Sequence, residues 1–255
     1  MLNLYGPGND LSLRWQKPFF APPVSQVLCL ILQVGGSVLA TPLDPKLLKG
    51  YGDVLRAYIN SGGRLGVVVG GGDVSRSYVR AASALGLPEV ERDRLAIGVS
   101  RLNARLLCLA TLGERAPKVA VSLVSAVRAF EELGYVFMGG LRPGMTTDYV
   151  ALQLAQALGC GTLLKATDQK GVYDSDPRSN PAARLLDRLS YSDLSSLVGP
   201  SQHTPGMHAI LDPLTVSRLP ATGIRMIVFD GRDPENVRRA LSGDRLGTEI
   251  SARQA

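Results

Sequence analysis

Three glycine-rich segments of the sequence each follow a short aliphatic run and precede an amphipathic stretch. They are Gly35-Gly36-Ser37, Gly70-Gly71-Gly72-Asp73 and the run 139–148. In an open parallel sheet the carboxyl ends of the strands line the ligand crevice, and backbone N–H groups at helix starts attract phosphate. One such glycine is usually only a tight turn. Three segments in the same relative position predict a phosphate-binding site.

These segments match neither of the two common nucleotide-binding motifs. The first strand–helix turn lacks the G-x-G-x-x-G spacing of dinucleotide-binding folds. Gly139 and Gly144 have the spacing of a P-loop, but Met145 stands where that motif needs a phosphate-binding lysine. The phosphates must therefore be held in another way.

Charged residues near the glycine segments are candidates for that work. Arg76 follows the second segment and keeps its charge at any physiological pH. Asp148 ends the third segment, where a carboxylate could orient cationic groups or a metal ion. Alternatively, Thr147 and Asp148 merely cap a helix expected over 149–158. Lys165 ends an aliphatic run and is either a phosphate ligand or a strand-end lysine that reaches solvent.

The elements that position these residues follow from aliphatic runs alternating with amphipathic stretches. Strands are expected at 27–34, 65–69, 118–121, 135–138, 162–166 and 225–229. Helices are expected from Asp44-Pro45 to near Gly62, from an Asp73 cap to near Gly86, and from Asp233-Pro234 to near Gly243. This alternation predicts an α/β fold with a mostly parallel sheet covered by helices.

One further stretch, 91–112, has apolar residues at helical spacing, which predicts that they lie in the core. They are Leu95, Val99, Leu102, Leu106 and Leu109. We expect residues 1–24 to form an irregular arm and 25–255 a single domain. A composition change after Ala166 indicates two lobes, one ending near 159 and one beginning near 160.

Composition narrows the class of protein. The chain of 255 residues is 45% hydrophobic and 20% charged, which is typical of globular proteins. Its 22 arginines and six lysines give a net charge of +6 but are scattered along the sequence. This pattern suits binding of a phosphorylated small molecule better than a specific nucleic-acid site.

No run reaches the roughly 18 uninterrupted apolar residues of a membrane helix. Cys29, Cys108 and Cys160 are expected to be reduced, in a cytoplasmic protein.

Several short motifs occur in a family-specific order. They are Gly35-Gly36-Ser37-Val38-Leu39, Val68-Val69-Gly70-Gly71-Gly72 with Arg76, Thr146-Thr147-Asp148, Gly171-Val172-Tyr173-Asp174-Ser175-Asp176-Pro177, Ile210-Leu211-Asp212-Pro213-Leu214, and Gly243-Asp244 with Gly247-Thr248. In this order the sequence, from 27 to about 250, resembles the amino acid kinase superfamily and specifically the archaeal-type uridylate (UMP) kinases. The resemblance implies a three-layer αβα sandwich, ATP-dependent conversion of UMP to UDP in pyrimidine nucleotide synthesis, Mg²⁺ on the nucleotide and a homo-hexamer.

The resemblance also implies roles for individual residues. Asp148 and Arg76 would organise phosphoryl transfer. The acceptor-side lobe would end near 159, and the ATP-side lobe would follow. ATP would be bound by Gly36, Ser37, Gly72, Arg76, Thr167, Tyr173 and Asp176. UMP would be bound by Gly71, Asp93, Leu141, Arg142, Pro143, Gly144, Met145, Thr146 and Thr147. By itself, the charged run around Asp93 indicates only a solvated helix start.

Two departures from the family pattern leave other functions open. Many superfamily members have a lysine just before the first glycine segment, where this chain has Gln33 and Val34, and some have another near His208-Ala209. A non-catalytic ATP- or oxyanion-binding storage or regulatory protein on the same fold is the main alternative. A carboxylate or carbamate kinase is another. We assign no role to His203 or His208.

Overall fold

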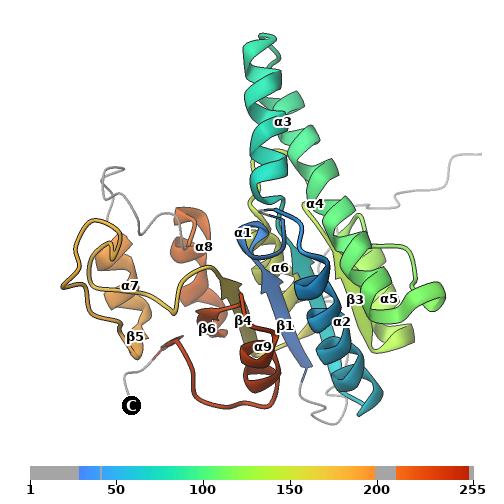
Figure 1. Cartoon of the computed structure of the whole chain (residues 1–255). Helices are drawn as coiled ribbons and strands as arrows, with labels where there is room; N and C mark the ends of the chain where they lie inside the picture. The colour runs from blue at the N-terminus through green and yellow to red at the C-terminus, as the bar shows by residue number, and fades with distance from the viewer. Residues whose placement is uncertain (1–28, 41, 199–210, 253–255) are drawn as a thin grey trace, which may run out of the picture.

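A seven-stranded, mostly parallel sheet forms the middle layer of the protein (Figure 1). The computed structural model describes residues 29–40, 42–198 and 211–252. The strand order is β3-β2-β1-β4-β6-β7-β5, and only β7 runs antiparallel to a neighbour, β6, among the pairs described. The strands are β1 (Cys29–Val34), β2 (Arg64–Val69), β3 (Tyr135–Met138), β4 (Thr162–Thr167), β5 (Arg188–Ser190), β6 (Arg225–Asp230) and β7 (Thr248–Ser251). The expected α/β class is confirmed.

Helices cover both faces of the sheet and enclose two apolar cores. One face packs against α2 (Pro45–Asn60), α4 (Glu89–Leu112) and α9 (Pro234–Leu241). The other packs against α5 (Leu123–Leu133), α6 (Thr147–Leu158), α7 (Tyr191–Val198) and α8 (Pro213–Arg218). The short α1 (Gly36–Leu39) and the longer α3 (Gly72–Ala84) begin directly after β1 and β2. The result is the three-layer sandwich that the motifs imply.

The glycines after β1 and β2 are required by a close approach of two loops. A Cβ atom on Gly36 would lie 1.9 Å from the backbone nitrogen of Gly72. Gly72 itself has a φ of +63°, a conformation that other residues rarely adopt. The first two glycine segments therefore touch, and both helix starts that follow them lie at the same edge of the sheet.

Most expected elements are confirmed, with two corrections. Residues 118–121 do not form a strand, because only Ala120 makes a bridge, to Met138. Asp73 is not the cap of α3, because Gly71 occupies that position and the Asp73 carboxylate pairs with Arg76 instead. Strands β5 and β7 were not expected. The arm 1–24, His203 and His208 lie outside the described residues.

The apolar residues of α4 are not all in the core, contrary to the sequence expectation. Val99 is buried, but Leu102 is 69% exposed and Leu95, Leu106 and Leu109 are more than one-third exposed. In Figure 1, α3 and the first part of α4 project beyond the rest of the fold. The stretch Glu89–Arg115 is also long and apolar enough to cross a membrane by length and composition alone, a test that core helices pass as well.

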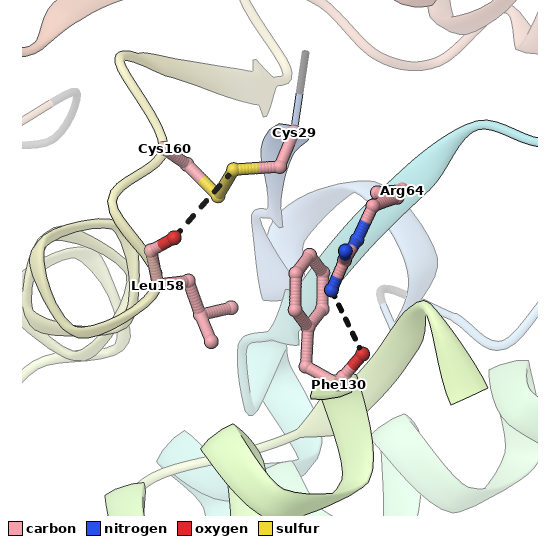
Figure 2. Close-up of a disulfide and its surroundings, with 5 residues drawn as sticks. All are labelled: Cys29, Arg64, Phe130, Leu158 and Cys160. Atoms are coloured by element: carbon pink, nitrogen blue, oxygen red, sulfur yellow. Dashed lines mark hydrogen bonds between the residues drawn. A yellow bond between two sulfur atoms is a disulfide. The ribbon is translucent and has the colours of Figure 1, made fainter. Parts of the chain in front are cut away.

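The prediction of three free thiols is wrong for two of them. Cys29 and Cys160 form a disulfide, with Cα atoms 5.1 Å apart (Figure 2). The two residues are 131 positions apart, but β1 and β4 are paired neighbours, with Leu30 opposite Thr162. Their separation in sequence gives no sign of this contact. Cys108 is free and buried, and burial raises the pKa of its thiol to about 11.

Candidate functional site

A cavity of about 270 Å³ lies at the carboxyl ends of β2 and β3. Its walls come from the start of α3, from α4 and from the loop that leads into α6. The residues lining it are Gly71, Gly72, Ser75, Arg76, Asp93, Ala96, Ile97, Ser100, Gly140, Arg142, Met145, Thr146 and Thr147. The fold thus brings two of the three glycine segments into one site, together with Arg76 and Asp93.

The loop 141–147 is held in place by α4. The Asp93 carboxylate accepts a hydrogen bond from the Gly144 N–H at 2.7 Å. Arg101 donates to the carbonyl oxygens of Gly140 and Leu141, at 3.0 and 3.1 Å. Asp93 is therefore more than part of a solvated helix start. Arg101 was missed because nothing in the sequence relates it to a loop some 40 residues away.

Arg76 lies one turn into α3, beside the cavity. Its Nε donates to Asp73 at 2.8 Å, and its side chain is 55% exposed. An exposed ion pair of this kind contributes little to stability, at most about 1 kcal/mol. The guanidinium can therefore turn its donors toward a bound phosphate at small cost.

A buried charge pair lies where α6 meets the carboxyl ends of β1 and β4. The Lys165 Nζ atom is 2.6 Å from Asp148 Oδ1 and 3.3 Å from Gln33 Oε1. The side chains of Lys165 and Asp148 are 7% and 14% exposed. Lys165 therefore does not reach solvent as a strand-end lysine would, and that alternative is wrong. The pair leaves a cation and an anion fixed at the edge of the site.

The cap of α6 is Thr146, so the capping alternative for Thr147 and Asp148 is wrong. The Thr146 hydroxyl accepts from the Tyr149 N–H at 3.1 Å and donates to Asp212 at 2.8 Å. Asp212 is in turn the cap of α8. Asp148 lies in the first turn of α6, where a carboxylate is favoured by the helix dipole, and its charge meets Lys165.

The other sequence-predicted residues lie outside this cavity, near the ends of β1 and β4. Gly36 and Ser37 begin α1, and Thr167 ends β4. Tyr173 and Asp176 follow in the loop after β4, where Asp176 accepts from the Arg178 N–H at 2.9 Å. Of the loop 141–147, the residues Leu141, Pro143 and Gly144 do not line the cavity.

Asp230 and Arg232 form an ion pair that the sequence analysis did not predict. They lie at the carboxyl end of β6, next to β4. Arg232 donates to Asp230 from its backbone N–H, its Nε and its terminal nitrogen, and these bonds lower the Asp230 pKa. The same guanidinium interacts electrostatically with Asp168 and Tyr173. A fixed positive charge therefore lies beside the loop that follows β4.

Comparison with known proteins is consistent with this arrangement. Residues 29–230 match the family described as the amino acid kinase family. The chain is 40% identical over 222 residues to a uridylate kinase of Halorubrum lacusprofundi, covering 87% of this chain and 92% of that protein. It is 39% identical over 222 residues to a uridylate kinase of Hyperthermus butylicus, covering 87% and 97%.

A solved structure has the same fold. The uridylate kinase of Archaeoglobus fulgidus superimposes with a TM-score of 0.78 at 32% identity, covering 88% of this chain and all of that one. UMP kinase from Bacillus anthracis gives a TM-score of 0.73 at 22% identity, covering 88% and 96%. The second comparison shows the fold alone.

Proposed function

Because this chain belongs to the amino acid kinase family, among its archaeal-type uridylate kinases, we propose that it transfers the γ-phosphoryl group of ATP to UMP. One observation of the structure carries the proposal. A cavity walled by glycine backbone and Arg76 lies at the same sheet edge as the buried Lys165–Asp148 pair. Phosphoryl transfer is mainly positioning and neutralisation of phosphate oxygens, and these groups are suited to both.

We assign UMP to the cavity and ATP to the edge formed by β1 and β4. The acceptor-side part of the chain ends near 159, and the ATP-side part follows. In the cavity, the loop 141–147 with Gly71 and Asp93 would hold UMP. At the ATP edge, the earlier part of the chain would also contribute, through the backbone N–H groups of Gly36, Ser37 and Gly72, the last of which lies between the two sites. In the later part, Thr167, Tyr173 and Asp176 would surround the adenosine.

Arg76 and Asp148 would have the catalytic roles. Arg76 would reach the phosphates from α3 and neutralise charge on them. Asp148 would hold the Lys165 ammonium in a fixed position in a site where water is largely excluded. Preorganised charge of this kind stabilises a transition state more than it would in water.

The residues present fit a Mg²⁺ ion carried on the nucleotide. The described part of the chain contains no group of three or more side chains that could hold a metal ion by itself. Mg²⁺ needs no such group when phosphate oxygens are its main ligands and one or two carboxylates complete the set. Asp148 would supply the protein oxygen. When bound, the ion neutralises charge on the transferring phosphoryl group.

The proposal includes a homo-hexamer working in pyrimidine nucleotide synthesis in the cytoplasm. The exposed leucines of α4 support the assembly, because contact with a second copy would remove this apolar surface from water. Sedimentation velocity at micromolar concentration measures the assembly directly. A monomer would contradict this part of the proposal.

The activity is tested by measuring ADP release with UMP, CMP, AMP, GMP and small carboxylic acids as acceptors. We expect turnover with UMP well above that with the others. ATP binding without turnover on any acceptor would favour the storage or regulatory alternative. Turnover with a carboxylic acid would favour a different kinase of the same family.

A further inference from the structure

Gln33 is a polar residue buried inside the sheet, next to the charge pair. It lies at the carboxyl end of β1 and is 2% exposed. Its register partner on β4 is Lys165, so both side chains leave the sheet on the same face, the one covered by α6. An uncharged polar side chain at such a position costs stability unless it makes a hydrogen bond. The Gln33 Oε1 atom accepts one from the Lys165 ammonium, at 3.3 Å.

The ammonium of Lys165 has three N–H donors in a tetrahedral arrangement. Asp148 accepts one of them and Gln33 accepts another. Within the described part of the chain, no third acceptor is bonded to it. Two fixed acceptors prevent rotation of the ammonium about its last bond. The direction of the third N–H is therefore set by Gln33 and Asp148 together.

We propose that Gln33 is a positioning residue for phosphoryl transfer, which acts by holding Lys165 so that its third N–H points at the transferring phosphoryl group. The inference rests on the proposed function. With Asp148 alone, the ammonium could rotate about the axis of one hydrogen bond. A donor fixed in direction stabilises developing charge better than one that must reorient during the reaction.

The amide of Gln33 accepts a hydrogen bond from Lys165 without placing a further charge beside it. A glutamate would add a second carboxylate, which would bind the ammonium tightly and repel phosphate. A neutral acceptor orients Lys165 and leaves its charge available to the substrate.

A double-mutant cycle tests this role. Gln33→Met and Gln33→Leu remove the acceptor while keeping an apolar side chain of similar volume, and each is made in the wild type and in Lys165→Met. We expect Gln33→Met to lower kcat about tenfold, with the KM for UMP and the melting temperature nearly unchanged. In the Lys165→Met background, the same change should have no further effect on kcat. High enzyme concentrations and long incubations keep the slowest variants measurable.

Each result decides between orientation of Lys165 and a purely structural role. If the kcat losses of the two single variants multiply in the double variant, Gln33 acts independently of Lys165 and the proposal is wrong. A lower melting temperature with unchanged kcat also overturns it. Should Gln33→Met be poorly folded, Gln33→Leu gives the same comparison. If the wild type phosphorylates another acceptor, the proposal of UMP as substrate is wrong. The role of Gln33 is then tested by the same double-mutant cycle with that acceptor, and the same results support or overturn it.

Discussion

Strands β1 and β4 are joined at both ends, but by different chemistry. At the amino end, the Cys29–Cys160 disulfide links them covalently (Figure 2). At the carboxyl end, Gln33 and Lys165 share a hydrogen bond, and Asp148 completes the group. The two ends are roughly 13 Å apart along β1, because a strand rises about 3.3 Å per residue.

This comparison separates stability from chemistry along one pair of strands. The disulfide carries no charge that could bind a substrate. The charged group at the carboxyl end adds little to the free energy of unfolding, because burying its charges costs about as much as their attraction returns. Changes at the amino end should therefore affect unfolding alone. Changes at the carboxyl end should affect turnover, and they should also lower stability where they leave one buried charge without its partner. The following predictions test that separation.

Removal of the disulfide is expected to have the largest effect, and on stability alone. The bond closes a loop of 131 residues, and a cross-link of that span typically stabilises a protein by about 3–5 kcal/mol. We expect the double variant Cys29→Ser/Cys160→Ser to unfold at a lower guanidinium concentration, while its kcat when folded stays within about twofold of wild type. Equilibrium unfolding and ADP release measure the two quantities.

A count of thiols provides the control. In denatured protein that has not been reduced, one cysteine, Cys108, should react with a thiol reagent, and reduction should release two more. Three reactive thiols before reduction would show that the bond does not form in solution. A large loss of kcat in the folded double variant would show that the two ends of the strand pair are coupled.

Asp148→Asn should have the next largest effect, and mainly on turnover. The substitution removes the counter-charge of Lys165 and keeps the size of the side chain. We expect kcat to fall by roughly 10²-fold or more, which corresponds to about 2.7 kcal/mol of transition-state stabilisation. The KM for UMP should change much less, because the loop 141–147 still holds the acceptor. Steady-state kinetics at saturating ATP measure both.

The same variant should also unfold more easily, since it leaves the buried Lys165 ammonium without a partner. Asp148→Asn/Lys165→Met is the matched control, because it removes both charges. We expect its stability to return toward wild type while its kcat stays low. Near-normal kcat in Asp148→Asn would show that the charge pair is structural only.

Arg76→Ala should have a smaller effect on turnover and little on stability. The substitution removes an exposed guanidinium beside the cavity, and alanine favours the helix. We expect kcat/KM to fall about tenfold, or roughly 1.4 kcal/mol. Arg80→Ala, one turn further along α3, removes an exposed arginine that does not line the cavity and should leave the kinetics unchanged. Equal kinetics in the two variants would reject a role for Arg76.

Local patterns in the sequence predicted most of the sheet and the glycine segments of the site. Strand β3 was predicted residue for residue, because its aliphatic run ends abruptly at glycines. The contacts that join distant segments could not be predicted. Gln33 and Lys165 are 132 residues apart, and only the pairing of β1 with β4 brings them together.

Errors arose where one local signal has two meanings. Leucines at helical spacing predict one apolar face of a helix, but they do not say whether anything covers it, as Leu102 shows. Thr146, Thr147 and Asp148 are all suitable caps, and only the contacts of Asp148 with β4 reveal that its carboxylate serves Lys165. Both ambiguities concern tertiary neighbours, which a single sequence does not record.

The smallest effect is expected for the partly exposed ion pair of Arg232 and Asp230, at the carboxyl end of β6. Arg232 lowers the pKa of Asp230, so the unfolded state binds the proton more readily than the folded state. The pair therefore contributes stability above the unfolded pKa, about 3.9, and this contribution is lost as pH falls through the lower folded pKa. With the Arg232 side chain 58% exposed, the contribution at pH 7 should be under about 1 kcal/mol. Denaturant unfolding of Arg232→Ala and wild type at pH 7 and at pH 3 measures it, and the difference between the two proteins should shrink at pH 3. If Arg232→Ala instead destabilised the protein as much as Asp148→Asn, burial would not explain why breaking the Lys165–Asp148 pair costs more stability than breaking the Arg232–Asp230 pair.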